Sequence, residues 1–549
     1  MAGLDGYGVG TKSGGNDMVE VDGGDFNYND KILVETSMDR YYDYFIRPLG
    51  TISNTSPKSV IRFSIDPLID KYLQFNKTRL EMKLRVVKGN GTRLSPLYDV
   101  VAVNNLLGVM IWESVVPLLN GQPFPGAANV DSGLKAFIDS LLSTEDAARH
   151  THASTQVLHM DEPDKYEDMS LPLQDFIDGV LHELQHGGLE LPPGLLALRQ
   201  QPAAGAAELT PAQRAGTYQI PYNGAEAIGG QIYIKADDVK QFIQMEATRP
   251  AQQGASTITN LGNMYEVGKP DYMRNRGFYE RYKLVRMSEE FTVVAPIPHD
   301  FFNLNNNIGP GNRIDIELKP YEDKLLLNTR NPHDRYRIEI MDIRMHLRAI
   351  ERKERIQPPL VERYRMNQTE LRKQTVHAGT TNYHFRIEHT TMLPKTIIFA
   401  FNDTRAVEGD YTRNPVHFSH FGLKKIYLVI NGERYPTNPL LFDFNKTNPD
   451  CTWGYHWLFE NTGCLLTNRG NLITLNQFMT GAFLIAFDLT PDKCNGVHNH
   501  KGQYGSIDVE FEWDAPLQDG ITIVYEKVFN KLVVNNKLTS QLAVLDVDA

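Results

Sequence analysis

The sequence has few cysteines, no long apolar run and no excess of positive charge. Its three cysteines, Cys451, Cys464 and Cys494, are too few and too irregularly spaced for a disulfide framework or a closed zinc site, so we expect reduced thiols. No apolar run approaches the length that crosses a bilayer, and no membrane span is expected. The net charge of −11 argues against a protein whose whole surface grips nucleic acid, so no sequence-specific nucleic-acid binding is expected.

The first 35 residues also lack the basic flank and apolar core of a secretory signal, and we expect a protein made and kept in the cytosol or nucleus. Residues 1–35 are rich in Gly, Asp and Asn, which predicts a flexible N-terminal arm. The rest is typical of a globular protein, with 41% hydrophobic and 22% charged residues. At 549 residues the chain suits two or three domains, each with its own core.

Two segments of the chain repeat the same strand-and-turn pattern. Val115–Pro125 reads VVPLLNGQPFP and Ile426–Pro436 reads IYLVINGERYP, so each is an apolar run closed by Asn-Gly. Asn-Gly tolerates the positive φ angles of a tight hairpin turn, and each copy therefore predicts a strand that enters a hairpin. A second pair, Ile314–Leu318 and Ile507–Phe511, predicts two further equivalent strands with alternating polarity.

The spacing of these repeats locates an insertion. The early pair is offset by about 311 residues and the late pair by about 193, so the first copy holds about 118 additional residues. The pattern predicts a duplicated β domain with one large insertion between Gly121 and Ile314. Residues 146–270 fall in that interval and are punctuated by Pro, Gly and Ala, which indicates a surface excursion from the first domain.

Short segments rich in β-branched and aromatic residues recur along the chain, as is typical of antiparallel β sandwiches, and no βαβ alternation is present. Five apolar residues follow the spacing of one helix face and predict a short amphipathic helix beside the sheets: Leu134, Phe137, Ile138, Leu141 and Leu142. The predicted strands are Val60–Ile65, Leu80–Val87, Met110–Leu119, Gln231–Ile234, Arg281–Val285, Phe291–Ala295, Arg313–Leu318, Tyr336–Leu347, Tyr383–Glu388, Thr396–Phe401, Lys424–Asn431, Phe483–Asp488, Ile507–Trp513 and Ile521–Val528.

A basic stretch lies before the second domain, which we expect to begin after Pro359. We interpret it as a solvated linker between the domains rather than as a nucleic-acid contact. Its residues are Arg344, Arg348, Arg352, Lys353 and Arg355.

One motif fits a zinc protease. His182-Glu183-Leu184-Gln185-His186 has the H-E-x-x-H spacing that sets two imidazoles on one helix face, with the glutamate as base. However, Gly187-Gly188 ends the helix at once, and no third ligand follows at a recognised spacing. We interpret the motif as a chance match and expect no metal site.

Three other groups of residues could carry chemistry. Gly6–Ser13 resembles a phosphate loop, but Thr11 breaks its Gly-Lys-Ser core and no strand precedes it, so we expect a flexible tail. An acidic cluster lacks the residue order of an EF-hand, and we expect a solvated loop. The scattered histidines are accompanied by no Gly-x-Ser-x-Gly elbow or comparable nucleophile motif. We interpret them as satisfied or exposed polar residues. We therefore predict no enzyme, no catalytic, metal or cofactor-binding residues, and no cofactor. The acidic cluster is Asp161, Glu162, Asp164, Glu167 and Asp168, and the histidines are His417, His420, His456, His498 and His500.

Four blocks of the sequence are specific when taken together: Leu393–Phe401, Asn414–Phe418, Ile426–Pro436 and Ala486–Asp492. In these blocks the chain resembles the double jelly-roll major capsid proteins of Polinton (Maverick) elements and adintoviruses. The resemblance extends, more weakly, from about residue 40 to 530, and the first half shares the Asn-Gly turn followed by a helix at 133–142.

This resemblance implies an all-β fold of two tandem eight-stranded antiparallel jelly rolls, with residues 36–355 in the first and 356–549 in the second. It implies a virion protein whose homotrimer is a pseudo-hexameric, hexon-like capsomer that tiles an icosahedral shell around a double-stranded DNA genome. The partners it implies are further copies of the chain, neighbouring capsomers, and penton or minor capsid proteins. The protein would be made in the host cytoplasm, with the nucleus as an alternative place of assembly. The 146–270 excursion would form outer loops or a tower, and the arm would lie at the inner face of the shell.

Two alternatives stay open. One is a zinc metalloprotease that uses His182, Glu183 and His186, and the other is a tandem β-sandwich carbohydrate-binding protein. The second would normally require a secretion signal and a groove lined by exposed aromatic side chains.

Overall fold

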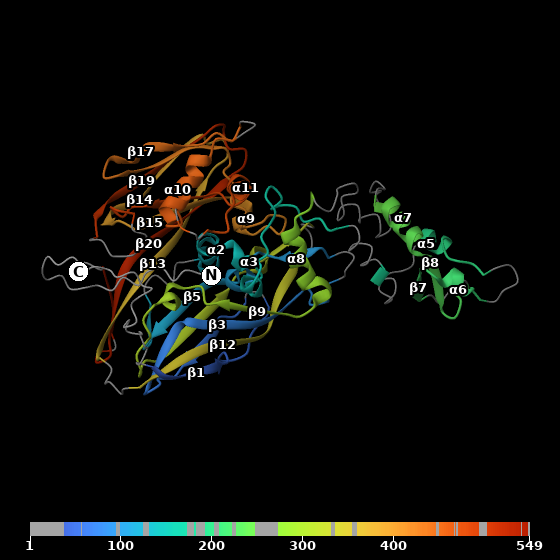
Figure 1. The fold of residues 1–549 in the computed structure, drawn as a ribbon, viewed down its shortest axis with the longest axis horizontal. Helices are drawn as coiled ribbons and strands as arrows, with labels where there is room; N and C mark the ends of the chain where they lie inside the picture. Colours follow the sequence, from blue (N-terminus) through green and yellow to red (C-terminus); the bar gives the residue numbers. More distant parts are fainter. Residues whose placement is uncertain are drawn as a thin grey trace, which may run out of the picture.

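The structure is a computed structural model, and Figure 1 shows two β sandwiches side by side with a smaller lobe standing away from them. The residues that it describes are 38–546 without 56–57, 95–98, 125–130, 173–180, 183–192, 203–207, 222–224, 226, 248–272, 331–334, 354–358, 446–448, 466, 468–469, 494–501 and 540.

Strands dominate the described residues, and the helices lie in connections. The strands are β1 (Met38–Ile46), β2 (Ile61–Ile65), β3 (Lys71–Lys88), β4 (Val101–Val103), β5 (Trp112–Leu119), β6 (Gln122–Pro123), β7 (Thr217–Pro221), β8 (Gln231–Lys235), β9 (Phe291–Pro296), β10 (Ile314–Pro320), β11 (Leu327–Thr329), β12 (Tyr336–Arg352), β13 (Val361–Val376), β14 (Asn382–Met392), β15 (Thr396–Asp403), β16 (Leu423–Ile430), β17 (Glu433–Leu441), β18 (Leu484–Asp488), β19 (Tyr504–Trp513), β20 (Ile521–Asn536) and β21 (Gln541–Asp546). The α-helices are α1 (Leu107–Met110), α2 (Ser132–Ser143), α3 (Asp146–Arg149), α5 (Pro193–Ala197), α6 (Pro211–Arg214), α7 (Ala236–Ala247), α8 (Arg276–Val285), α9 (Thr404–Glu408), α10 (Thr452–Thr462) and α11 (Leu475–Thr480), and the 3-10 turns are η3 (His152–Gln156), η6 (Arg286–Ser288), η7 (Asp300–Asn303) and η8 (Asp323–Leu325).

The two sandwiches have the same strand order. In the first, one sheet runs β1-β12-β3-β9 and the facing sheet β2-β10-β5-β6. In the second, the corresponding sheets run β13-β20-β15-β18 and β14-β19-β16-β17, and β21 adds to β20. All of these pairs are antiparallel, and each order interleaves early and late strands of its half, as in a jelly roll. We call these units the first roll and the second roll.

The register confirms that the two rolls are copies. Ile314 of β10 is paired with Leu119 of β5, and Ile507 of β19 is paired with Ile430 of β16. These are the positions that the two sequence offsets relate to each other. In both rolls the turn asparagine accepts a hydrogen bond from the strand opposite, at 2.9 Å, through Asn120 in the first and Asn431 in the second. The predicted duplication is therefore confirmed down to the pairing of single residues.

The two predicted Asn-Gly hairpins are also confirmed. Asn120 and Gly121 have φ angles of 52° and 79°, and Asn431 and Gly432 have 51° and 89°. Positive φ at both central residues defines the type I′ turn, whose twist matches that of the flanking strands. Each turn joins its strands directly, β5 to β6 and β16 to β17.

We expect Gly432→Ala to lower the free energy of unfolding by about 1 kcal/mol, because an L side chain strains the left-handed backbone. Nothing lies within 4 Å of an added Cβ, so the loss measures backbone strain without a clash. Denaturant unfolding checks the value. Gly470→Ala is the control, since Gly470 has equal space and no positive φ. Equal stabilities of the two variants would contradict the assignment of the turn.

Three sequence-based predictions in this region are wrong or incomplete. Arg281–Val285 is not a strand, because Asn275 caps a helix by accepting a hydrogen bond from the Phe278 N–H group, and α8 runs through these residues. The basic stretch is not a linker as far as Arg352, because its first three arginines, Arg344, Arg348 and Arg352, lie on strand β12. Strands β1 and β13 were missed, because polar and charged side chains outnumber apolar ones in β13, and because β1 is mostly exposed and carries Asp39, Arg40 and Asp43 among its tyrosines.

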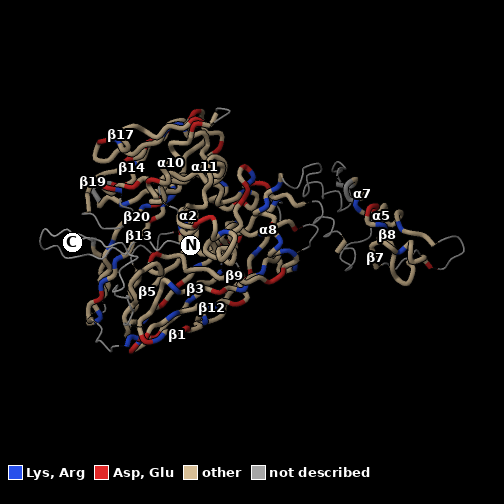
Figure 2. Tube along the Cα trace, viewed as in Figure 1, with Lys and Arg blue, Asp and Glu red and all other residues tan. Residues whose placement is uncertain are grey.

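Arg344 and Arg348 of β12 form ion pairs within the sheet while their side chains stay partly exposed, one along β12 itself and one to the neighbouring strand β1. Arg344 contacts Asp342 at 2.7 Å, and Arg348 contacts Asp43 of β1 at 2.9 Å. Basic and acidic residues are interspersed over both rolls (Figure 2). Arg355 lies outside the described residues.

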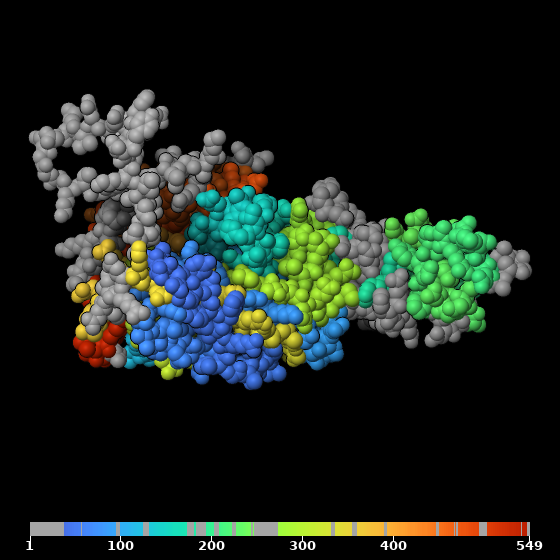
Figure 3. All heavy atoms as spheres, turned by 60° about the horizontal axis from the view of Figure 1, so that its bottom comes forward, coloured from blue at the N-terminus to red at the C-terminus, as the bar shows by residue number. Residues whose placement is uncertain are grey.

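Part of the predicted excursion, residues 193–247, forms a separate lobe (Figure 3), whereas residues 146–172 pack against the two rolls. Strands β7 and β8 pair in register from Thr217 with Lys235 to Pro221 with Gln231, and α5, α6 and α7 lie beside them. The lobe has a small core of its own, made by Leu195, Ile220, Ile232, Ile234 and Val239. Within the described part of the chain, no helix is long and apolar enough to cross a membrane.

The two rolls exchange parts of their cores. The predicted helix is confirmed as α2, and although it belongs to the first half, its apolar face packs into the core of the second roll, where Phe137 meets Phe418 at 6.0 Å between ring centroids. In return, Tyr364 of β13 and Val533 of β20 are buried in the core of the first roll. We call this two-way exchange the interlock.

Candidate functional site

The catalytic alternatives find little support in the geometry. His182 has helical backbone, while Glu183 and His186 of the possible zinc motif lie outside the described residues, as do Gly6–Ser13, Cys494, His498 and His500. Among the described residues, no group of three His, Cys, Asp or Glu side chains is placed to hold a metal ion. Cys451 and Cys464 are free thiols.

The histidines that the structure describes make ordinary polar and stacking contacts. His417 Nδ1 lies 2.9 Å from Glu167 Oε1, and its ring stacks on Tyr166. His420 stacks on Phe444 and accepts a hydrogen bond from the Gly422 N–H group, while burial lowers its pKa to about 4. His456 is exposed and stacks on Trp453. These contacts agree with the prediction that they are satisfied or exposed polar residues.

The acidic cluster is not a solvated loop, contrary to the sequence-based interpretation. Asp161 is 1% exposed and forms an ion pair of 2.6 Å with Arg281. It also accepts hydrogen bonds from Asn275 and, across to the second roll, from Asn414 at 3.1 Å. Glu167 reaches the second roll as well, through His417. The cluster therefore contributes to the contact between the two rolls.

A second polar network joins the rolls through Glu362 at the start of β13. Glu362 is 6% exposed. Its carboxylate accepts hydrogen bonds from Asn312 of the first roll at 2.9 Å and from Asn535 of β20 at 3.1 Å. The Tyr364 hydroxyl donates to the same oxygen, and Lys537 forms an ion pair of 2.7 Å with the other one. Because every partner is directional, this network fixes β13 against the first roll in one orientation.

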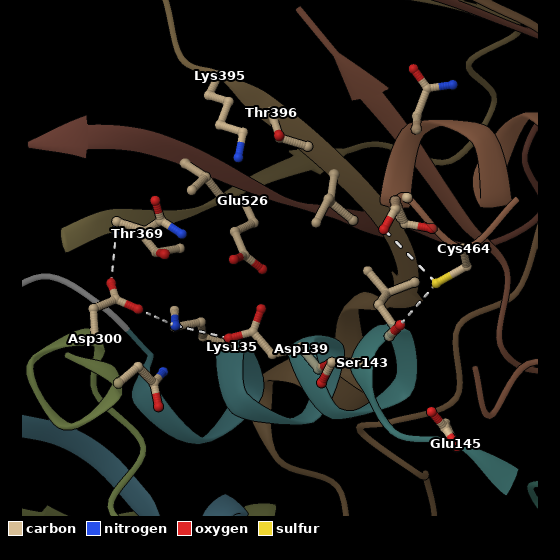
Figure 4. Close-up of a pocket in the computed structure, with 18 of the residues that line it drawn as sticks. Lys135, Asp139, Ser143, Glu145, Asp300, Thr369, Lys395, Thr396, Cys464 and Glu526 are labelled. Atoms are coloured by element: carbon tan, nitrogen blue, oxygen red, sulfur yellow. Dashed lines mark hydrogen bonds and ion pairs between the residues drawn. The ribbon is translucent and has the colours of Figure 1, made fainter. Parts of the chain in front are cut away.

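The third contact surrounds Lys135 of α2. Its ammonium group bridges Asp139 at 2.8 Å and Asp300 at 2.6 Å (Figure 4). Asp300 in turn accepts a hydrogen bond from the backbone N–H of Thr369 in β13. Burial lowers the pKa of Lys135, but the two carboxylates raise it more, and its pKa stands well above the usual value. The lysine is therefore held charged where the two rolls meet.

The three networks around Asp161, Glu362 and Lys135 together form what we call the junction. The junction is the best candidate functional site. Its geometry can hold two sandwiches at a fixed angle, and it assembles no nucleophile with a base. Sequence reasoning did not identify Lys135, Glu362 or Glu526 as important. A signal existed for Lys135, which interrupts the apolar face of its helix, and for Glu526, which follows the apolar run from Ile521.

Comparisons with known proteins give the fold. No protein-family model matches the chain, and no curated protein matches it in sequence. Among solved structures, a chain in the cryo-EM structure of the Sputnik virophage matches with a TM-score of 0.56 at 10% identity, over 97% of this chain and 94% of that one. The mavirus major capsid protein matches with a TM-score of 0.40 at 10% identity, over 97% of each chain. The Faustovirus major capsid protein matches with a TM-score of 0.44 at 8% identity, over 92% of each.

The Sputnik match spans nearly the whole of both chains, so it covers both rolls together. At this level of identity, it establishes architecture. Strand order, register and this similarity agree, and the chain has the antiparallel double jelly-roll fold, with a large insertion in its first half.

Proposed function

We propose that the chain is a major capsid protein whose homotrimer is the capsomer of an icosahedral shell around a double-stranded DNA genome. The observation that carries this proposal is the pair of equivalent jelly rolls held at one angle by the interlock. Three such chains would supply six similar sandwiches to a ring, which gives a nearly hexagonal tile. The role is structural, so we assign no catalytic residue.

Two further observations support the proposal. The sequence resembles the capsid proteins of Polinton elements and adintoviruses, and the fold resembles that of a chain in the Sputnik virophage structure. In addition, Tyr41 and Phe45 on strand β1 are 64% and 65% exposed, which is unusual for aromatic side chains unless another surface covers them. In the capsomer we expect this strand to contact a neighbouring copy.

The proposal also assigns roles to the remaining segments. Residues 36–355 and 356–549 would be the two rolls, residues 1–35 an inner arm, and the lobe of the 146–270 excursion would decorate the outer face of the capsomer. Penton or minor capsid proteins would be further partners in the virion, after synthesis in the host cytoplasm.

We expect the purified protein to have a mass of three times 62.2 kDa by light scattering. Electron microscopy of the same sample should show particles with six-fold-looking top views. Phe45→Asp places a charge in the expected contact and should shift the mass towards that of one chain, while Leu538→Asp, at an exposed position outside β1, serves as the control. A wild-type protein that stays a single chain at micromolar concentration would contradict the trimer.

A further inference from the structure

A cavity of about 580 Å³ lies at the junction, between α2 and η7 of the first roll and β13, β15, β20 and α10 of the second (Figure 4). Its rim is open, because Glu145, Asn303 and Asn367 are exposed. Its floor is closed, because Lys135 is 5% and Glu526 1% exposed. The cavity therefore connects solvent with the charged groups buried between the rolls.

The charges around this junction cavity do not balance. Its lining includes the carboxyl groups of Asp139, Glu145, Asp300 and Glu526, but only two ammonium groups, those of Lys135 and Lys395. The charge of Lys135 is already divided between Asp139 and Asp300. Lys395 approaches from the opposite wall (Figure 4). Within the described contacts it forms no ion pair with Glu526.

Glu526 lies beside Asp139, and within the described part of the chain one of its two carboxyl oxygens is left without a partner in this arrangement. It points into the cavity from the central strand β20 (Figure 4), and its Oε2 atom has no hydrogen-bond partner among the described residues. Burial, together with the nearby carboxylates of Asp139 and Asp300, raises the pKa of Glu526 well above its usual value. A buried carboxyl oxygen without a partner costs free energy, which a ligand that donates a hydrogen bond would recover.

We propose that the junction cavity binds an organic primary ammonium group, with Glu526 and Asp139 as its acceptors. An ammonium group offers three donors and one positive charge, which match the free oxygen and the excess of carboxyl groups. Leu142, Ile398 and Val528 add apolar wall that suits a methylene chain. A bare metal ion fits less well, because no described set of three acidic, His or Cys ligands is in place.

The ligand would strengthen the joint between the two rolls. It would contact α2 of the first roll and β20 of the second at once, and a ligand that binds only the folded chain raises its stability. The ammonium group has two possible sources, a free polyamine or a lysine side chain of a partner protein. This inference does not depend on the proposed capsid function.

The test is calorimetric titration of the full-length protein with spermidine, and separately with Nα-acetyl-lysine methylamide as a mimic of a protein lysine. We expect at least one of them to bind and to raise the melting temperature. Glu526→Gln, which keeps the shape of the side chain, should weaken binding by about tenfold or more. Glu145→Gln removes the same charge at the rim and should have a much smaller effect.

The pH dependence gives an independent readout. The raised pKa of Glu526 favours the protonated carboxyl group in the empty cavity, whereas an ammonium ligand favours the carboxylate. Affinity should therefore rise with pH in the wild type and lose this dependence in Glu526→Gln. If Glu526→Gln does not fold, Asp139→Asn replaces it.

The relative affinities of the two probes identify the source of the ligand. Tighter binding of spermidine would indicate a polyamine, and tighter binding of the lysine mimic would indicate a partner protein. Absence of binding by both probes to the wild type, or equal binding by wild type and Glu526→Gln, would overturn the proposal.

Discussion

Leu141→Ala is expected to lower the free energy of unfolding by about 2–5 kcal/mol, the range for truncating a buried leucine. Leu141 is 1% exposed on α2, and its side chain belongs to the core of the second roll although it lies in the first half of the sequence. Its carbonyl oxygen also accepts a hydrogen bond from Leu472 of the second roll at 3.0 Å. Chemical denaturation followed by tryptophan fluorescence measures the change.

The control for this variant is Leu441→Ala, because Leu441 is 61% exposed and its truncation should change stability by less than about 0.5 kcal/mol. The interlock adds a second expectation, that the rolls unfold together. The Leu141→Ala midpoint should shift as one transition. A transition that splits, with one roll unfolding at the wild-type midpoint, would show that the rolls are independent and would contradict the interlock.

Arg281→Met is expected to lower the free energy of unfolding by about 3–5 kcal/mol, at least as much as Leu141→Ala. The reason is that it leaves the buried carboxylate of Asp161 without its cation. Arg281 is 1% exposed, and its guanidinium also donates to the backbone carbonyl groups of Val103, at 2.9 Å, and His159. These acceptors would lose their donors as well. Thermal unfolding by calorimetry would detect the loss as a large fall in melting temperature.

Two further variants separate charge from geometry at this site. Arg281→Lys keeps the positive charge but loses the planar guanidinium group with its paired N–H donors. We therefore expect it to lower the free energy of unfolding by less than Arg281→Met does. Asp161→Asn in the Arg281→Met background removes the stranded carboxylate and should recover part of the stability. A double variant no more stable than Arg281→Met would indicate that packing, and not the unpaired charge, causes the loss.

The fold was largely predictable because its strongest signals are local. Asn-Gly at 120–121 and at 431–432 sets both turns, and alternating polarity sets the strands beside them. The two offsets then located the insertion without any structural information. The strands β1 and β13 were missed because polar and charged residues on them point outward or pair across the sheet, which hides the apolar alternation.

The junction was not predictable, because its partners lie far apart in the sequence. Asp161 and Asn414 look like polar loop residues until the two rolls bring them together. Glu526 and Lys135 come from different rolls, and although each stands beside apolar residues, nothing in the sequence shows that the two meet in one cavity. Arg281 was placed in a strand because its helix is short and the capping signal of Asn275 was not used.

The exchanged core elements set a limit on how this protein can change during evolution. A crossover that joined the first half of one variant to the second half of a distant relative would place α2 in a cavity shaped for another helix. The same crossover would pack the ends of β13 and β20 against the first roll of another variant, whose core they do not match. Inheritance should therefore keep the two halves together as one gene segment, even though each half has the same strand order.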